Sequence, residues 1–295
     1  MTSRRIFIQQ ASILATAAIV SPSFILKEHY KLGLQLYTIR EAMSSDLKGT
    51  LQKISSFGYE EVEIYGFSNM KYYGLDPKTF KGLLDDNNLT TSSGHYELNK
   101  FILPGSTDDD LKKYIDECIE GANILKQDYI VWPWLDPDSR TMDKFKILSE
   151  KLNRIGEQLK KANLAAMYHN HDFEFIDHNG QIGYDLILQE TDPSLVKMEM
   201  DLYWFSHSSK LTPLDYFKKY PGRFVSWHLK DMNKVDRNLH EVMGDGSIDY
   251  KTILADAKLA GAKHMFVEQG NNYTPDAMQN VAKSAKYVKN VLFKP

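Results

Sequence analysis

The stretch that decides the fold is residues 129–171, where YIVWPW (129–134) is followed by a helical pattern and then by LAAMYHNH (164–171). YIVWPW and LAAM are apolar runs of strand length, whereas MDKFKILSEKLNRIGEQLKKAN (142–163) repeats its apolar residues every three or four positions. The helical pattern closes with Asn163, a residue type that often ends helices. A strand, a helix and the next strand form a βα unit of roughly 30 residues.

The same unit recurs from Lys31 to the C-terminus. The predicted strands are LGLQLY (32–37), EEVEIY (60–65), TTSSGHY (90–96), YIVWPW (129–134), LAAMYHNH (164–171), VKMEMD (196–201), FVSWHLKD (224–231) and HMFVEQ (264–269). Eight such units in about 265 residues predict an α/β fold, a single (β/α)8 TIM barrel over residues 31–295. A doubly wound sheet is the alternative, but TIREAM follows the first strand where that fold has a glycine-rich turn.

Composition places the chain among soluble globular proteins. Its 295 residues are 42% hydrophobic and 25% charged, which is sufficient for a full core. The net charge of −3 gives no basic surface, so we expect no nucleic-acid partner. Cys118 is the only cysteine, which excludes an intramolecular disulfide and a thiolate cluster. Any metal must therefore use nitrogen and oxygen ligands.

The N-terminus differs from the rest of the chain. Arg4 and Arg5, with Phe7 and Ile8, precede the apolar run ASILATAAIV, and this pattern resembles a twin-arginine export signal. We assign residues 1–28 to this signal and expect a periplasmic protein. No cysteine follows the apolar run, so no lipid anchor to a membrane is expected. The sequence leaves the cleavage site and the oligomeric state open, a homo-oligomer included.

Polar side chains gather at the ends of the predicted strands, where active sites of such barrels lie. These residues are His95, His169, His171, Glu199, Asp201, His228, Lys230 and Glu268. Because strand side chains alternate between faces, residues two apart, such as His169 and His171, can point inward together. Acids and imidazoles crowded at one barrel mouth are stable only if a cation or a substrate pairs with them. Asp, Glu and His together are a donor set for a divalent metal.

The chain resembles the sugar phosphate isomerase/epimerase group of the xylose-isomerase-like TIM barrels from about Leu32 to its C-terminus. The matching segments are QLYTIR (35–40), YHNHDFEF (168–175), MDLYW (200–204), WHLKDM (227–232), GDGSIDY (244–250) and FVEQ (266–269). The resemblance implies one divalent ion, commonly Mn, Co, Mg or Zn. Asp201, His228 and Glu268 match the metal ligands that this group takes from its sixth, seventh and eighth strands.

The fifth strand departs from the epimerase pattern. Related epimerases carry a glutamate there in a segment like LALENH, and aligning ENH with HNH places His169 at that position. Glu174 is the other candidate for the fourth ligand. Trp204 stands where the epimerases have a histidine, and HNH resembles the HHH stretch of inosose-dehydratase-like relatives.

Such a site supports chemistry through an enolate. A divalent ion that binds a sugar carbonyl and its neighbouring hydroxyl stabilises the enolate, so the proton on the carbon between them can be removed. Returning the proton gives isomerisation or epimerisation, whereas expelling a β-oxygen gives elimination. The predicted acid/base groups are Glu268 and either Glu174 or His169.

The remaining candidates surround the predicted centre. Lys230 polarises a substrate oxygen or, alternatively, forms a salt bridge with Asp231 or Glu199. The predicted substrate contacts are His95, His171, Trp132, Trp204 and Glu199. Further aromatic residues at strand ends, Tyr37, Tyr65, Trp134 and Phe205, have ring faces that can stack on a sugar.

The expected function is a metal-dependent isomerase or epimerase acting on a non-phosphorylated sugar or keto sugar, with a lyase or dehydratase as the alternative. GDGSID (244–249) is interpreted as a turn that starts a helix, capped by Asp249 or Ser247, instead of a phosphate loop. Without a P-loop or an arginine cluster, phosphorylated substrates are disfavoured. A non-catalytic sugar-binding barrel and a metal-dependent phosphoesterase or nuclease remain as alternatives from other classes.

Overall fold

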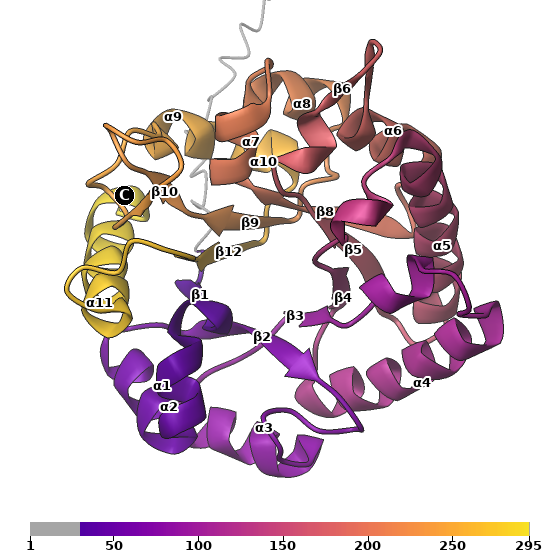
Figure 1. The fold of residues 1–295 in the computed structure, drawn as a ribbon. Coiled ribbons are helices and arrows are strands. Elements are labelled where there is room, and N and C mark those ends of the chain that lie inside the picture. Colours follow the sequence, from indigo (N-terminus) through magenta and orange to yellow (C-terminus); the bar gives the residue numbers. More distant parts are fainter. Residues whose placement is uncertain (1–29, 295) are drawn as a thin grey trace, which may run out of the picture. The chain divides into compact units, whose positions relative to one another are not determined.

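Eight parallel strands close into a barrel in the computed structural model, which describes residues 30–294. Figure 1 looks into the ring, with the strands inside and the helices around them. The predicted (β/α)8 architecture is therefore confirmed. The predicted export signal at residues 1–28 lies outside the described residues.

Each predicted run overlaps one barrel strand, and β2 extends two residues beyond its run, to Phe67. The strands are β1 (Gly33–Gln35), β2 (Glu61–Phe67), β3 (Ser93–Tyr96), β4 (Tyr129–Trp132), β5 (Ala165–His169), β8 (Val196–Asp201), β9 (Ser226–Leu229) and β12 (His264–Val267). Their order around the ring is β1-β12-β9-β8-β5-β4-β3-β2. Several strands end before the predicted run does, because the polar residues at the barrel mouth leave the sheet and form loops.

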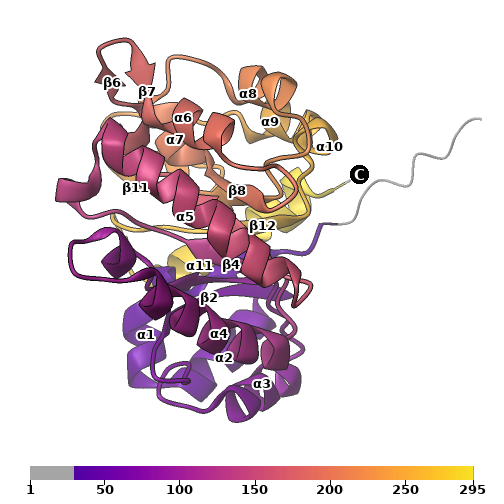
Figure 2. The ribbon, with the colours of Figure 1, turned by 90° about the vertical axis from the view of Figure 1, so that its right-hand side faces the viewer.

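Helices cover the outside of the barrel. They are α1 (Arg40–Ser45), α2 (Leu47–Ser56), α3 (Pro77–Asp86), α4 (Asp108–Leu125), α5 (Met142–Lys160), α6 (Gly183–Glu190), α7 (Leu202–Ser208), α8 (Pro213–Lys219), α9 (Tyr250–Ala255), α10 (Ala257–Ala260) and α11 (Ala277–Tyr287). Figure 2 shows α4 and α5 along the outer side. A capping box between Thr107 and Asp110 starts α4. No helix among the described residues has the length and apolarity needed to cross a membrane.

Two small hairpins extend the loops of the barrel. β6 (Asp177–His178) pairs with β7 (Gln181–Ile182), and this hairpin projects from one corner in Figure 2. β10 (Asp231–Met232) pairs with β11 (His240–Glu241) directly after β9. The second hairpin carries the chain over the end of β9, next to the polar residues of the barrel mouth.

The segment 244–249 is a turn that starts a helix, as predicted. Asp249 caps α9 by accepting a hydrogen bond from the backbone N–H of Thr252. The carboxylate of Asp231 accepts hydrogen bonds from the N–H groups of Gly244, Gly246 and Ile248. These N–H groups are thus bound to a side chain of the protein, which leaves them unable to hold a phosphate.

Because side chains alternate between the two faces of each strand, the inward-facing side chains form layers inside the barrel. On β5, Met167 and His169 share the inward face. Met167 packs with Val131 of β4 in a buried apolar cluster. The polar residues of the site therefore rest on an apolar layer inside the barrel.

Candidate active site

Five polar side chains converge at the carboxyl ends of four consecutive strands of the ring. His169 ends β5, Asp201 ends β8, His228 lies in β9, Lys230 follows β9, and Glu268 follows β12. All five are buried. Ligand atoms of His169, Asp201, His228 and Glu268 lie within 4.8 Å of one another, and we call these four residues the upper cluster. The structure thus brings together all three residues matched to metal ligands and one fifth-strand donor.

The two carboxylate oxygens of Asp201 have different surroundings. Oδ1 caps α7 by accepting hydrogen bonds from the N–H groups of Tyr203 (2.9 Å) and Trp204 (3.0 Å). Oδ2 lies 2.7 Å from Lys230 Nζ and 3.5 Å from His169 Nε2. It is buried and makes no hydrogen bond of good geometry with either. One oxygen therefore builds the helix, and the other is directed at the cluster.

His169 presents one ring nitrogen to the upper cluster. Its Nδ1 lies 3.3 Å from the carbonyl oxygen of Pro133, and its Nε2 lies 3.1 Å from Nδ1 of His228. Because a carbonyl only accepts, Nδ1 carries the hydrogen and the lone pair of Nε2 faces the cluster. The next residue, Asn170, binds the backbone of Asp201 by accepting from its N–H at 3.1 Å. The HNH segment thus supplies both a donor for the cluster and a clamp between β5 and β8.

Two predicted site residues lie outside this cluster. The carboxylate of Glu174 accepts hydrogen bonds from the Tyr168 hydroxyl (2.6 Å) and from the His171 N–H (2.9 Å). Tyr168 alternates with His169, so this contact lies on the outer side of β5. Burial raises the pKa of Glu174 to about 8. Trp132 is likewise turned outward and is fully buried. Strand alternation therefore separates Glu174 from the upper cluster and Trp132 from the cavity, contrary to their predicted roles.

Lys230 pairs with two members of the upper cluster. Its Nζ lies 2.7 Å from Asp201 Oδ2 and 2.7 Å from Glu268 Oε2, so the expected alternative partners, Asp231 and Glu199, are wrong. Burial alone would lower the pKa of Lys230, but the two carboxylates raise it above its ordinary value. The Tyr250 hydroxyl fixes the backbone of Lys230 by accepting from its N–H and donating to its carbonyl. A fixed cation therefore stands beside the upper cluster.

A second polar layer lies below the first, inside the barrel. It contains two carboxylate–imidazole pairs: Glu63 with His228 Nε2 at 2.7 Å, and Glu199 with His95 Nε2 at 2.9 Å. Ser226 donates to Glu199 Oε1 at 2.7 Å. We call Glu63, Glu199 and His95 the lower layer. Glu199, predicted to contact substrate, is fully buried in this layer.

A divalent cation fits the upper cluster. The donors are two imidazole nitrogens and two carboxylates, a set that suits Zn and Co through its nitrogens and Mg and Mn through its oxygens. Oδ2 of Asp201, which lies beside Lys230 but accepts no hydrogen bond, and the converging nitrogens of His169 and His228 would be satisfied together by one cation. In the lower layer, in contrast, each carboxylate already pairs with a histidine and accepts a hydrogen bond from a serine hydroxyl. The lower layer therefore needs no cation of its own.

A cavity of about 650 Å³ opens beside the upper cluster. Its walls include Tyr37, Tyr65, His95, Trp134, His169, His171 and Glu268. Trp134 and Tyr37 are 41% and 46% exposed, and guanidinium groups lie against their rings: Arg140 at 4.5 Å from the first and Arg40 at 4.7 Å from the second. Aromatic walls next to a polar floor are typical of a binding site for a sugar-like molecule.

Two histidines of the cavity wall differ in charge. Burial, with His169 and Lys230 nearby, holds the pKa of His171 well below its ordinary value. Burial would also lower the pKa of His95, but Glu63 and Glu199 raise it to about 9. At neutral pH, His171 is thus a neutral imidazole and His95 is protonated. The predicted substrate contacts His95 and His171 are both in place to touch a ligand.

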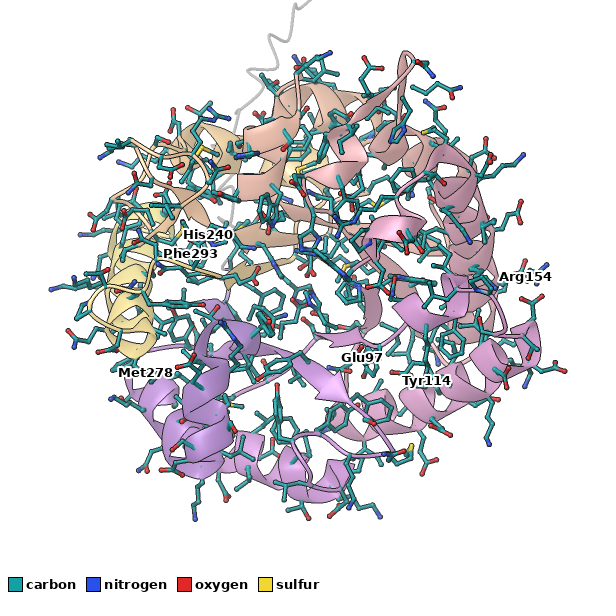
Figure 3. All side chains as sticks on the ribbon, viewed as in Figure 1. Glu97, Tyr114, Arg154, His240, Met278 and Phe293 are labelled. Carbon is teal, nitrogen blue, oxygen red and sulfur yellow. The ribbon has the colours of Figure 1, made fainter. Side chains whose placement is uncertain are left out.

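Hydrogen bonds that were not predicted from the sequence anchor the loops around the cavity. Side chains fill the ring in Figure 3, where Glu97 and Tyr114 are labelled beside each other; the Tyr114 hydroxyl accepts from the Glu97 N–H at 3.1 Å. His240, also labelled there, accepts from the Gly270 N–H at 2.7 Å and packs on Tyr203. Burial, with Lys230 nearby, lowers the pKa of His240 to about 3.

Trp204 was predicted from the sequence as a site residue, whereas Glu63 was not. Trp204, a predicted substrate contact, flanks His171, with ring centroids 5.8 Å apart. Glu63 was missed, although the alternation of EEVEIY already places it inward, two residues after Glu61. An acid at an inward-facing position of a predicted strand was the signal that could have identified it.

Comparison with known proteins agrees with this architecture. A family model described as "Xylose isomerase-like TIM barrel" matches residues 51–291, and the chain belongs to this family. A solved structure of a sugar phosphate isomerase/epimerase from Parabacteroides distasonis is 27% identical, with a TM-score of 0.74, covering 95% of this chain and 99% of the other.

Two similar proteins of known name are both called inosose dehydratase. Inosose dehydratase of Clostridium tetani is 27% identical over 168 residues, which are 50% of this chain and 55% of the relative. Inosose dehydratase of Lacticaseibacillus casei is 25% identical over 224 residues, covering 66% of this chain and 74% of the relative. The chain thus spans about half the length of the first relative and about three quarters of the second.

Proposed function

We propose that this member of the xylose isomerase-like TIM barrel family is a divalent-metal-dependent enzyme that removes a proton next to a sugar carbonyl and then eliminates a β-oxygen substituent. The observation that carries the proposal is the convergence of His169, Asp201, His228 and Glu268 beside a cavity whose wall includes His169 and Glu268. A cation held there supplies charge stabilisation for an oxyanion on the substrate.

The side chains around the cluster supply the other parts of the reaction. His171 and His95 line the cavity and are the proposed proton carriers: His171 takes the proton from carbon, and His95 gives one to the departing oxygen. Lys230 keeps the local charge balanced by pairing with Asp201 and Glu268. His169 and Glu268, predicted as acid/base groups, are instead assigned to holding the cation.

Two relationships favour elimination over isomerisation or epimerisation. The curated relatives are named dehydratases, and a dehydratase expels a β-oxygen. In addition, the fifth strand offers the imidazole of His169 to the cluster where epimerases have a carboxylate. Isomerisation or epimerisation is the second candidate, since it proceeds through the same enolate and the solved relative from P. distasonis is named an isomerase/epimerase.

The cavity favours a substrate with two parts. Its volume of about 650 Å³ is in the middle of the range for sites that enclose drug-sized ligands, roughly 300–1,000 Å³. Beyond His95, the walls continue along Leu98, Lys100 and Leu103 in the loop after β3. A keto sugar bound at the cluster therefore leaves space for an aglycone or a second ring along this loop and Trp134.

The test is incubation of the purified protein with Mn²⁺ or Co²⁺ and either 3-keto-glycosides or free ketoses, followed by mass spectrometry. Elimination predicts release of the aglycone, or loss of water, with formation of an unsaturated ketone. A product of unchanged formula would show that the enzyme isomerises or epimerises its substrate and does not eliminate a substituent. Binding without turnover of any keto sugar would favour a non-catalytic sugar-binding barrel and contradict both.

A further inference from the structure

We infer that Glu63 is a positioning residue for the cation centre: it holds the imidazole of His228 so that Nδ1 points to the cation. This inference rests on the proposed metal-dependent function and extends it to a residue of β2, on a strand that contributes nothing to the upper cluster. It follows from the two-sided contacts of His228 and from the way in which Glu63 itself is fixed.

The two ring nitrogens of His228 face different layers. Nδ1 lies 2.8 Å from Glu268 Oε2 and 3.1 Å from His169 Nε2, so it faces the upper cluster. Nε2 lies 2.7 Å from Glu63 Oε2 and 3.3 Å from Glu199 Oε2. Because a carboxylate only accepts, Nε2 carries a hydrogen for Glu63, and a cation bound at the upper cluster would replace the hydrogen that Nδ1 otherwise donates to Glu268. Glu63 is the nearer of the two carboxylates.

Glu63 is held in place by strands that lie on either side of it. Gln35 of β1 donates its side-chain N–H to Oε2 at 2.7 Å, and Ser93 of β3 donates its hydroxyl to Oε1 at 2.5 Å. Both contacts are buried, and β1 and β3 are the neighbours of β2 in the ring. The carboxylate is therefore fixed before it meets His228, which lies on a strand that is not adjacent to β2.

Glu199 has a different task in the same layer. Its Oε2 lies closer to His95 (2.9 Å) than to His228 (3.3 Å), and its Oε1 accepts from Ser226. The two acids and two histidines form one network, since His95 Nε2 also lies 3.2 Å from Glu63 Oε2, but Glu63 is the acid nearer to His228. Outer carboxylates that accept from a metal-bound histidine fix the ring and strengthen its donor nitrogen, and their loss typically weakens metal binding about 10- to 100-fold.

The test is titration of the full chain with Co²⁺ and with Zn²⁺, comparing wild type, Glu63→Gln and Glu61→Gln. Glu61 is the matched control, because it lies on the inward face of the same strand and pairs with His264 at 3.1 Å, away from the upper cluster. We expect Glu63→Gln to weaken binding about 10- to 100-fold and to change the visible spectrum of bound Co²⁺, and Glu61→Gln to leave both unchanged. Folding of each variant is checked by circular dichroism.

The outcomes are distinguishable. Wild-type affinity and an unchanged Co²⁺ spectrum in folded Glu63→Gln would overturn the inference while leaving the proposed function standing. A wild-type protein that binds neither ion would overturn the proposed function and this inference with it. If Glu63→Gln does not fold, Ser93→Ala carries the test, because it removes one hydrogen bond from Glu63; a weaker loss of affinity in the same direction supports the inference, and wild-type affinity contradicts it.

Discussion

Nε2 of His169 lies 3.1 Å from Nδ1 of His228, so two imidazole nitrogens from different strands face each other inside the barrel. Nδ1 of the first ring is directed at a backbone carbonyl, and Nε2 of the second is directed at a carboxylate. Nε2 of His169 therefore presents its lone pair, and a cation shared by the two rings would replace the hydrogen that Nδ1 of His228 donates to Glu268.

Asp201→Asn should remove the metal without removing the helix cap. The amide oxygen still accepts from Tyr203 and Trp204, but the anionic ligand is lost. Asp201→Ala should lose the metal and also about 1 kcal/mol of stability from the cap. Metal content by mass spectrometry and urea unfolding measure the two effects. Asp249→Asn, at the cap of α9, is the control; metal retained in Asp201→Asn would contradict the assignment.

Glu174→Gln should flatten the dependence of stability on pH. The pKa of Glu174 is raised from about 4.5 to about 8, so the folded state holds a proton that the unfolded state releases between these values. Stability from this group is therefore complete below pH 4.5 and falls as the pH rises to 8, by about 1.4 kcal/mol for each pKa unit.

Urea unfolding of wild type and Glu174→Gln at pH 5, 6.5 and 8 measures this effect. The variant should gain on wild type as the pH rises, because glutamine imitates the protonated acid at every pH. Glu157→Gln, at an exposed position, is the control and should follow wild type. Parallel curves for wild type and Glu174→Gln would show that Glu174 is ionised in the folded state.

Trp134→Ala should weaken binding of substrates that carry a second ring. Stacking on an aromatic face contributes about 1 kcal/mol, so KM should rise roughly fivefold for such substrates and less for a single keto sugar. Because Trp134 also contacts His171, with ring centroids 4.7 Å apart, an unchanged kcat shows that the proton carrier is undisturbed. Trp134→Phe should restore most of the affinity; equal effects on large and small substrates would place the second ring elsewhere.

We also propose that the chain is exported to the periplasm. Replacing Arg4 and Arg5 together by lysine should leave the protein in the cytoplasm, because the signal is read through this arginine pair. Cell fractionation and immunoblotting measure the distribution. Lys48→Arg, within the barrel sequence, is a control for altered basic residues. Unchanged export of the double variant would argue against a twin-arginine signal.

The sequence predicted the part of the site that depends on strand ends. His169, Asp201, His228 and Glu268 were found because polar residues interrupt apolar runs and side chains alternate. The same alternation, applied to Tyr168, would have turned Glu174 away from the mouth.

Long-range pairing could not be predicted in the same way. Glu63 contacts His228 across 165 positions of the chain, and the alternation of EEVEIY places Glu63 inward without showing which residue of another strand it meets. The double ion pair of Lys230 was missed for a similar reason, since its partners come from two other strands.

The central claim is that the cavity removes a proton next to a sugar carbonyl. The most direct measurement is proton NMR of a cyclic α-hydroxy ketone that has no oxygen on its β carbons, incubated in D₂O with the Mn²⁺- or Zn²⁺-loaded protein and, in parallel, with Asp201→Asn. We predict that the signal of the hydrogen next to the carbonyl disappears with wild type much faster than with Asp201→Asn or with buffer and metal alone. Exchange no faster than in buffer, from a protein shown to hold its metal, would contradict the claim.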